Sequence, residues 1–253
     1  MDQKFDFKDL FILDMANNHQ GDVEHGLNIV RSFAKVVKGR EARAALKFQF
    51  RQLDTFIHPD HQKKSDHKQV QRFMSTRLLR DKYQLLLDEV RASGLISMCT
   101  PFDEASVDII CDMGFDVIKV ASCSGKDWPL LEKIADAGKP VIFSTGGLTI
   151  RDIDNLVSFF QHRGVHFAIM HCVAIYPTPD QNMNLQQIAL LRSRYPGTHI
   201  GWSTHESPSD VTPVQLAVAL GAELFERHIG IATKEAPLNA YSSTPEQADT
   251  WRV

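Results

Sequence analysis

Two apolar segments near the end of the chain each stop at a histidine. The segment 199–205 ends in His205 and the segment 223–228 ends in His228, with an amphipathic stretch between them. If both are parallel strands that lie side by side, the two imidazoles emerge at the same edge of one sheet. Two histidines so placed provide half of the coordination shell of a divalent metal ion. A histidine at a strand end is more often a hydrogen-bonded loop residue, so the metal interpretation depends on what the other strands carry.

Two lysines sit where apolar residues would be expected. Lys47 and Lys119 alternate with apolar neighbours in segments that have the pattern of strands. A lysine in that position either extends its side chain out to solvent or meets an anion. The nearby sequence Ser144-Thr145-Gly146-Gly147 offers hydroxyl and backbone donors that suit a phosphate or a carboxylate, although small residues also form ordinary turns.

Strand and helix patterns alternate along the whole chain. The predicted strands are 10–15, 44–50, 95–99, 117–120, 141–143, 165–170, 199–202 and 223–226. Eight such units predict an α/β fold, a (β/α)₈ TIM barrel, formed by one domain over residues 1–253, with its last helix truncated. An open doubly wound sheet is the structural alternative. Residues 51–75 interrupt the pattern and predict a long loop with some helix.

The barrel would gather the polar strand ends into one site. Active sites of this fold lie at the C-terminal ends of the strands. The residues that follow or end the predicted strands there are Asp14, Asn17, Asn18, His19, Lys47, Gln49, Thr100, Asp103, Lys119, Ser122, Ser144, Thr145, His171, Tyr176, His205 and His228. A set this rich in titratable and hydroxyl groups indicates a catalytic or binding site.

Composition excludes several classes of protein. Hydrophobic residues make up 43% and charged residues 23% of the chain, as in soluble globular proteins. The net charge of −3 gives no general attraction to nucleic acid or to an anionic membrane. No apolar run is long enough to span a membrane, the polar start is no signal peptide, and four cysteines without CxxC spacing indicate reduced thiols. We therefore expect a cytoplasmic protein.

Several motifs, in order along the chain, resemble one enzyme family. They are Asn17-Asn18-His19-Gln20-Gly21-Asp22, Leu46-Lys47-Phe48-Gln49, Thr100-Pro101-Phe102-Asp103, Ile118-Lys119-Val120-Ala121-Ser122, Ser144-Thr145-Gly146, His171-Cys172, Tyr176-Pro177, Asn184-Leu185, Gly201-Trp202-Ser203-Thr204-His205 and Glu226-Arg227-His228. Together they are similar to the sialic acid synthase (N-acetylneuraminate synthase) family, and in particular to its spore coat polysaccharide biosynthesis branch. The resemblance spans nearly the whole chain.

The resemblance implies a transferase that forms a carbon–carbon bond. Such enzymes condense phosphoenolpyruvate with the aldehyde form of an N-acetylated sugar, of the N-acetylhexosamine type, to give a nonulosonic acid and phosphate. A divalent metal ion, Mn²⁺ or Mg²⁺, assists as a Lewis acid. By family position, His205 and His228 hold this ion, and Asp14 acts as a general base or contacts a metal-bound water. The resemblance further implies a homodimer.

The resemblance also implies where the two substrates bind. Phosphoenolpyruvate would contact Lys47, Thr100, Lys119, Ser122 and Ser144, and the two lysines count among the catalytic residues. The sugar would contact Asn18, Gln49, Tyr176 and Asn184.

The chain departs from the family pattern at several points. Asp14 replaces a glutamate, Ser124 stands where relatives carry a sugar-contacting glutamate, and Leu238-Asn239 replaces an Asp-His pair. The relatives also carry a C-terminal antifreeze-like domain, which we expect to be absent here. Two alternatives therefore stay open: a catalytically degenerate sugar-binding barrel subunit, and a related deoxy-sugar-phosphate synthase or aldolase. The second would need a further cation for an acceptor phosphate, and Arg51 is the obvious candidate.

Overall fold

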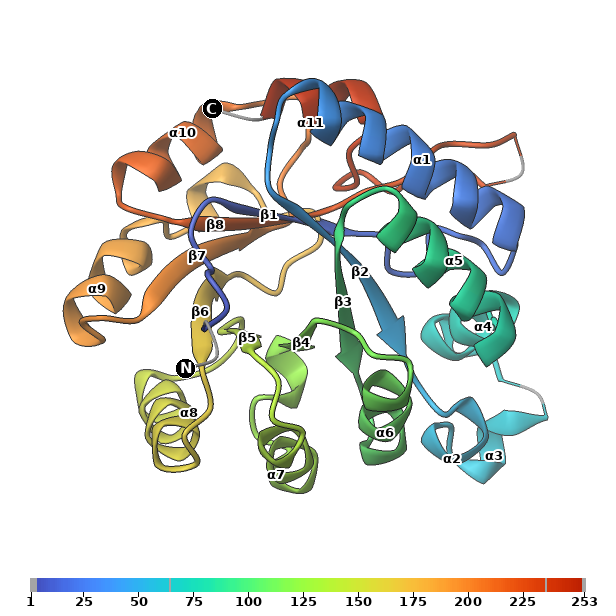
Figure 1. Ribbon diagram of the computed structural model, residues 1–253, viewed down its shortest axis with the longest axis horizontal. Coiled ribbons are helices and arrows are strands. Elements are labelled where there is room, and N and C mark those ends of the chain that lie inside the picture. The colour runs from blue at the N-terminus through green and yellow to red at the C-terminus, as the bar shows by residue number, and fades with distance from the viewer. Residues whose placement is uncertain (1–3, 64, 235, 252–253) are drawn as a thin grey trace.

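Eight parallel strands close into a barrel in chain order (Figure 1). The computed structural model describes residues 4–63, 65–234 and 236–251. Each strand pairs with its neighbours in sequence, and β1 pairs with β8 to complete the ring. The strands are β1 (Leu10–Asp14), β2 (Ala44–Phe50), β3 (Ile96–Pro101), β4 (Val117–Val120), β5 (Val141–Ser144), β6 (Phe167–Cys172), β7 (His199–Thr204) and β8 (Leu224–His228). The predicted (β/α)₈ barrel is confirmed, and the open doubly wound sheet is excluded.

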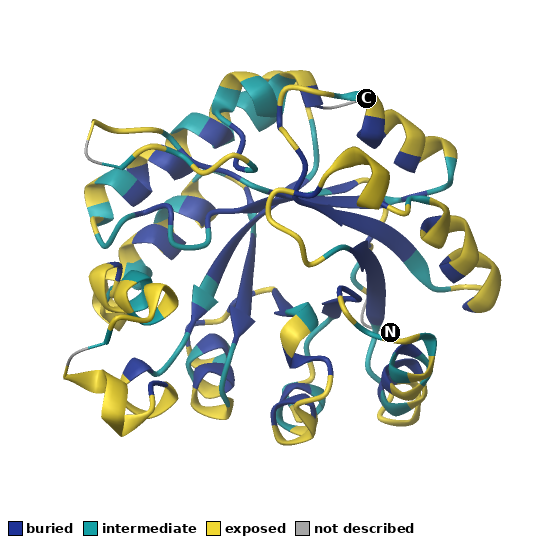
Figure 2. Ribbon diagram, turned by 180° about the vertical axis from the view of Figure 1, so that it is seen from behind, coloured by how far each residue is buried: buried dark blue, intermediate teal, exposed yellow. Residues whose placement is uncertain are grey.

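Helices surround the barrel (Figure 1). Their buried faces turn toward the strands and their exposed faces turn outward, as Figure 2 shows by colour. The helices are α1 (Val23–Gly39), α2 (Leu53–Phe56), α3 (Pro59–Gln62), α4 (Lys68–Ser75), α5 (Arg80–Ala92), α6 (Glu104–Asp112), α7 (Trp128–Asp136), α8 (Ile150–His162), α9 (Gln186–Arg194), α10 (Thr212–Ala219) and α11 (Pro245–Trp251). The predicted long loop after β2 holds the three short helices α2, α3 and α4.

Side-chain caps define where several helices begin. Asp22 accepts hydrogen bonds from the backbone amides of Glu24 and His25 at the start of α1, and Thr149 forms a capping box at the start of α8. The sequence Ser207-Pro208 has the pattern of a helix N-cap followed by proline at the first helical position, which predicts that the helix before β8 begins there, and this prediction is wrong. Helix α10 begins at Thr212, with Pro213 in its first turn, and Asp210 accepts a hydrogen bond from the Thr212 amide.

The interior of the barrel contains one apolar cluster, distinct from the larger core between strands and helices. Its buried members are Phe7, Leu10, Ile12, Ala45, Met98, Val117, Ile142, Ala168, Met170 and Leu224. Successive residues of a strand point to opposite faces, and the members of this cluster face the barrel interior. The residues two positions further along each strand, toward its C-terminal end, therefore also face the interior. Those positions include Asp14, Lys47, Lys119, Ser144 and Glu226. The apolar floor of the barrel therefore leads directly into a polar upper layer.

One glycine allows the strands to pack closely at this floor. A Cβ atom at Gly201 of β7 would lie 2.4 Å from the carbonyl oxygen of Leu224 on β8. No larger residue fits at that position without displacing the strand that carries Glu226 and His228.

In the part of the chain that the structure describes, no helix has the length and apolar character needed to cross a membrane.

Candidate active site

A polar cavity of about 190 Å³ opens at the C-terminal end of the barrel. Nearly every strand contributes to it, as the inward alternation requires. Its lining comprises Asp14, Lys47, Gln49, Thr100, Phe102, Lys119, Ala121, Ser122, Cys123, Ser144, Cys172, Tyr176, Ser203, Thr204, His205, Glu226, His228 and Tyr241. Most of the residues that the sequence placed in the site are thus neighbours in space.

Four charged side chains form a buried network at the base of this cavity. Asp14, Lys47, Lys119 and Glu226 are each no more than 5% exposed. The Lys47 ammonium lies 3.0 Å from Asp14 Oδ2 and also contacts Glu226. The Lys119 ammonium lies 2.9 Å from Glu226 Oε2 and donates a 2.6 Å hydrogen bond to the Ser144 hydroxyl. Two positive and two negative charges therefore balance one another in a site shielded from water.

The two lysines of this network have different electrostatic surroundings. Burial alone would lower the pKa of Lys47, but Asp14 and Glu226 together raise it above the ordinary value. Burial and repulsion by Lys47 lower the pKa of Lys119, and the single carboxylate that faces it, Glu226, offsets them only in part. Burial would raise the pKa of Glu226, but Lys119 and Lys47 hold it well below its ordinary range. Glu226 is therefore a carboxylate that bridges both lysines.

The two histidines lie next to each other at the rim of the network. Their ring centroids are 5.4 Å apart. The Nδ1 atom of His205 lies 3.1 Å from the carbonyl oxygen of Val173, and Nδ1 of His228 lies 3.5 Å from Asp14 Oδ2. Such contacts fix ring orientation and leave the other ring nitrogen available to a ligand. Burial lowers the pKa of His205 to about 3 and also lowers the pKa of His228, so both rings are neutral near neutral pH.

The donor set fits a divalent metal ion in part. Neutral imidazoles are the form that binds a metal, and the Asp14 carboxylate is beside them. Over residues 4–63, 65–234 and 236–251, no group of three or more His, Cys, Asp or Glu side chains has the geometry of a metal site. The chain thus offers His205 and His228 as a pair, and water or substrate would have to supply the remaining ligands.

Two tyrosines cover the histidines. The ring of Tyr176 lies 4.0 Å from that of His205, and Tyr241 lies 5.2 Å from His228 and 5.3 Å from Tyr176, measured between ring centroids. Burial raises the pKa of both phenols, which stay protonated near neutral pH. These aromatic faces form one wall of the cavity mouth.

Hydroxyl groups occupy the side of the cavity near Lys119. The Ser122 hydroxyl accepts a 2.9 Å hydrogen bond from the amide of Gly146. A Cβ at Gly146 would lie 3.0 Å from that same hydroxyl oxygen, so a glycine allows the close approach. Thr100 is 1% exposed, and its hydroxyl has no hydrogen-bond partner among the described residues. An unpartnered buried hydroxyl that faces a cavity is a candidate contact for a ligand.

Two of the expected sugar contacts lie outside this cavity. The side-chain amide of Asn18 donates to the carbonyl oxygen of Ile229 at 2.7 Å and to the Ser242 hydroxyl at 3.1 Å, which ties the β1 loop to the segment after β8. Asn184 lines a separate, open cavity beside His171, whose ring contacts the carbonyl oxygen of Met183. Gln49 and Tyr176, the other two expected sugar contacts, do line the central cavity.

Sequence reasoning missed several residues that line this site, among them Glu226 and Tyr241. Glu226 was recognised as part of a motif but not as a site residue, although alternation from Leu224 to His228 places it on the inward face. Tyr241 lies in an irregular segment after β8, where no periodicity indicates its direction. Ser124, which the resemblance implies as the counterpart of a sugar-contacting glutamate, is buried and does not line the cavity.

Comparison with known proteins identifies relatives that match most of the chain. Spore coat polysaccharide biosynthesis protein SpsE of Bacillus subtilis is 34% identical over 230 residues, which cover 88% of this chain and 60% of that protein. N-acetylneuraminate-9-phosphate synthase of Drosophila melanogaster is 31% identical over 225 residues, 86% of this chain and 59% of that protein. The chain thus spans about 60% of the length of these curated relatives.

A solved structure agrees with this relationship. The crystal structure of a spore coat polysaccharide biosynthesis protein E from Chromobacterium violaceum superposes with a TM-score of 0.94 at 50% identity, covering 96% of this chain and 73% of that one. The family model described as the NeuB family matches residues 36–249, which hold all of the barrel strands except β1. The chain belongs to the NeuB family.

Proposed function

We propose that the protein condenses phosphoenolpyruvate with the aldehyde form of an N-acetylated sugar and releases inorganic phosphate. The observation that carries this proposal is the meeting of Lys47 and Lys119 with His205 and His228 in one cavity. A lysine pair suits a small substrate with several negative charges, and a histidine pair suits the ion that would activate a carbonyl. Relatives named as N-acetylneuraminate-9-phosphate synthase and N,N'-diacetyllegionaminic acid synthase support a nonulosonic acid as the product class.

Phosphoenolpyruvate would occupy the side of the cavity between β2 and β5. Lys47, Lys119 and Ser144 are already joined through Glu226 and through the Lys119–Ser144 hydrogen bond, which holds both ammonium groups in place. Thr100 and Ser122 would add hydroxyl contacts to its phosphate or carboxylate. Because Asp14 and Glu226 neutralise both lysines, the network has little net positive charge of its own. A divalent cation nearby would supply positive charge and so favour the binding of phosphoenolpyruvate.

His205 and His228 would hold a divalent ion, Mn²⁺ or Mg²⁺, whose chemistry is to polarise a carbonyl oxygen. Asp14, whose Oδ2 atom lies 3.5 Å from His228 Nδ1, would accept a proton from water near the ion. Gln49 and Tyr176 would orient the sugar across the mouth. Burial and the aromatic wall of Tyr176 and Tyr241 would keep bulk water away from the reacting carbons.

The reaction balances without a redox partner. The methylene carbon of phosphoenolpyruvate forms a bond to the aldehyde carbon, and the aldehyde oxygen takes up a proton to become a hydroxyl. Water then adds to the former enol carbon and loses a proton. The bond from that carbon to the phosphate oxygen then breaks while the new hydroxyl gives its proton to the leaving phosphate, which leaves a keto acid and inorganic phosphate. We expect the enzyme to act in the cytoplasm as a homodimer.

A direct assay tests the proposed function. The protein is incubated with Mn²⁺ or Mg²⁺, phosphoenolpyruvate and a panel of N-acetylhexosamines, and released phosphate is measured. We expect release that depends on both metal and sugar, and loss of it in Lys119→Met, with Lys133→Met, which does not line the cavity, as the matched control. Tight metal binding with no release for any sugar would overturn the catalytic proposal in favour of a sugar-binding subunit.

A further inference from the structure

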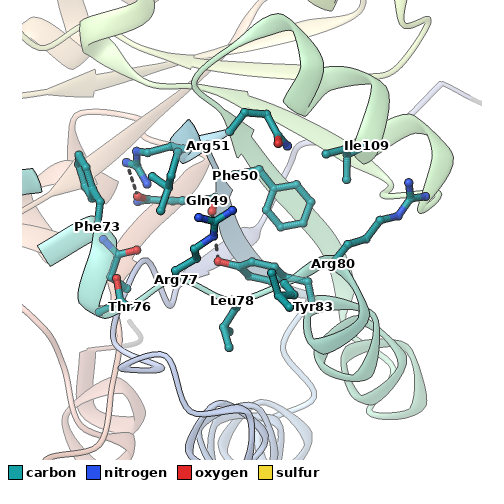
Figure 3. A pocket seen from close by; sticks show the side chains of 14 residues that line it. Gln49, Phe50, Arg51, Phe73, Thr76, Arg77, Leu78, Arg80, Tyr83 and Ile109 are labelled. Carbon is teal, nitrogen blue, oxygen red and sulfur yellow. Dashed lines mark hydrogen bonds between the residues drawn. The ribbon is translucent and has the colours of Figure 1, made fainter. Parts of the chain in front are cut away.

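A second cavity, of about 180 Å³, lies beside the active site, between the end of β2 and the helices α4 and α5 (Figure 3). Fourteen residues line it, and none of them is Asp or Glu. Three are arginines: Arg51, Arg77 and Arg80. Its polar lining is completed by amides and hydroxyls, among them Gln52, Thr76 and Tyr83. The lining therefore has the composition of an anion site rather than of an apolar gap.

Arg51 differs from the other two arginines in lacking a counter-ion. Arg77 forms a two-point salt bridge with Asp54, and Arg80 lies 3.6 Å from Asp112. Among the described residues, Arg51 forms no ion pair, and its buried Nε atom has no hydrogen-bond partner. Its guanidinium instead lies between two aromatic rings, 3.7 Å from the centroid of Phe102 and 4.3 Å from that of Phe73. The two rings hold the cation in a fixed position.

Arg51 carries its charge although it is largely buried. Burial lowers the pKa of its guanidinium to about 10, which is still well above neutral pH. A buried cation without a carboxylate partner is costly unless a ligand supplies the opposite charge. Arginine also presents a planar set of donors that matches phosphate and carboxylate oxygens. The unpaired buried charge and the planar donors of Arg51 both favour an anionic ligand in this cavity.

This cavity communicates with the proposed reaction site through Gln49. Gln49 lines both cavities. Its Oε1 atom accepts a 2.9 Å hydrogen bond from Arg51, drawn in Figure 3, and its Nε2 atom lies 3.5 Å from Asp14 Oδ2. Asp14 in turn contacts His228. A continuous polar path thus runs from the histidine pair, where the aldehyde carbon would react, to the Arg51 guanidinium. Phe102 also lines the central cavity while it stacks on Arg51.

We propose that the Arg51 cavity binds an anionic group, a phosphate, at the end of the acceptor sugar remote from its aldehyde. This inference rests on the proposed function and narrows it: the acceptor is a sugar phosphate rather than a neutral sugar. The aldehyde lies at His205 and His228, the chain of the sugar crosses Asp14 and Gln49, and its phosphate meets Arg51, Arg77 and Arg80.

Binding of an unreactive probe tests the inference apart from turnover. The probes are an N-acetylhexosaminitol 6-phosphate, which has no aldehyde, the same alditol without phosphate, and inorganic phosphate. Their affinities are measured by calorimetry with phosphoenolpyruvate in excess, which fills the lysine pair. We expect the phosphorylated alditol to bind about tenfold or more tightly than the plain alditol, because its charge-assisted hydrogen bonds replace water at Arg51. Equal affinity of both alditols would overturn the proposal. Binding of inorganic phosphate as tight as that of the phosphorylated alditol would overturn its assignment to the acceptor.

Two variants of one residue then separate charge from folding. Arg51→Met should remove the preference for the phosphorylated alditol, and Arg51→Lys should restore part of it. Arg163, whose guanidinium also lies over a phenylalanine ring and pairs with Asp136, gives the matched control Arg163→Met, which should leave the preference unchanged. A preference that survives in a folded Arg51→Met protein would contradict the proposal.

Turnover gives the second arm of the test. With N-acetylhexosamine 6-phosphates as acceptors, wild type should have a kcat/KM about tenfold or more above that with the free sugars, and Arg51→Met should lose this ratio mainly through KM. If no acceptor releases phosphate, the proposed reaction fails, while alditol binding still decides whether the cavity is an anion site. If free sugars react as well as their phosphates, the reaction stands and this inference fails.

Discussion

Glu226 forms an ion pair with Lys119, with 2.9 Å between Oε2 and Nζ, and both side chains are almost completely buried in the barrel interior. The same carboxylate also contacts Lys47. Glu226 therefore holds the side-chain nitrogens of both lysines in place at one cavity before any substrate arrives. Without it, the barrel would hold two cations that face a single carboxylate, Asp14.

The substitution Glu226→Gln should destabilise the protein. It leaves Lys119 without a carboxylate partner, and loss of one member of a buried ion pair costs about 3 to 5 kcal/mol. Denaturant unfolding near neutral pH measures the change in free energy, with the exposed Glu132→Gln as control, which should change it by less than about 0.5 kcal/mol. A change for Glu226→Gln as small as that of the control would show that the pair adds no stability.

The metal proposal predicts a specific loss for each histidine. His205→Ala and His228→Ala should each abolish tight binding of Mn²⁺, because a single imidazole cannot hold the ion alone. His171→Ala is the matched control, since His171 also ends a strand but contacts the carbonyl oxygen of Met183. Calorimetry with Mn²⁺ measures the affinity, and far-ultraviolet circular dichroism checks that the barrel is folded. Unchanged affinity in both variants would exclude the histidine pair as the metal site.

The sequence predicted the inner layer of this site better than its rim. Lys47, Lys119 and His228 lie on strands, so alternation alone fixed their direction once the barrel was recognised. The same rule applies to Glu226, whose role became clear only from its contacts with both lysines. The rim could not be predicted in this way. Asn184 adopts a positive φ of 48° in an irregular segment, and its direction depends on tertiary contacts.

The Arg51 cavity shows the same limit more clearly. The alternation in β2 continues only to Phe50, and the side chains that enclose Arg51 come from α4 and from the segment after β3. Nothing in the spacing of Arg51, Phe73 and Phe102 along the chain indicates that the two rings stack on one guanidinium. Their meeting follows from how the short helices after β2 pack against the barrel.

His19 makes the stability of the fold depend on pH. Burial, and then the positive charge of Arg72, lower the pKa of this fully buried histidine to about 4. In the unfolded chain the imidazole titrates at its ordinary value of 6.5, so below that pH the unfolded state binds a proton that the folded state does not. Stability contributed by neutral His19 is thus complete above pH 6.5 and is lost as the pH falls toward 4.

The variant His19→Gln isolates this contribution. Gln lacks the titrating group, so the difference in unfolding free energy between wild type and variant should shrink by up to about 1.4 kcal/mol for each pH unit below 6.5. The difference near pH 8 gives the part that comes from packing and from the hydrogen bond donated by the Gly21 amide to His19 Nδ1. A difference that is the same at about pH 8 and about pH 5 would mean that the protonation of His19 is not linked to folding.

A second buried ion pair holds the outer side of the site together. Arg227 points away from the barrel interior and pairs with Glu206, and both side chains are only 2% exposed. Arg227 also donates to the Ser243 hydroxyl at 2.6 Å and to the Glu206 carbonyl oxygen at 2.8 Å, and its guanidinium lies 5.4 Å from the Trp251 ring centroid. This residue therefore joins β8 to the loop that carries His205, to the segment after Tyr241, and to α11.

Removal of the Glu206 charge should loosen these loops as well as weaken the fold. Glu206→Gln leaves Arg227 buried and without its carboxylate, at a cost of about 3 to 5 kcal/mol. Because Glu206 follows His205 directly, we also expect Mn²⁺ affinity to fall, although the substituted side chain does not line the cavity. Replacement of both partners, Glu206→Leu with Arg227→Met, should recover much of the stability, because no charge is then left unpaired in the interior. Denaturant unfolding and Mn²⁺ calorimetry on the three proteins separate the two effects. Equal stability of Glu206→Gln and wild type would show that the charge of Glu206 does not stabilise the fold through Arg227.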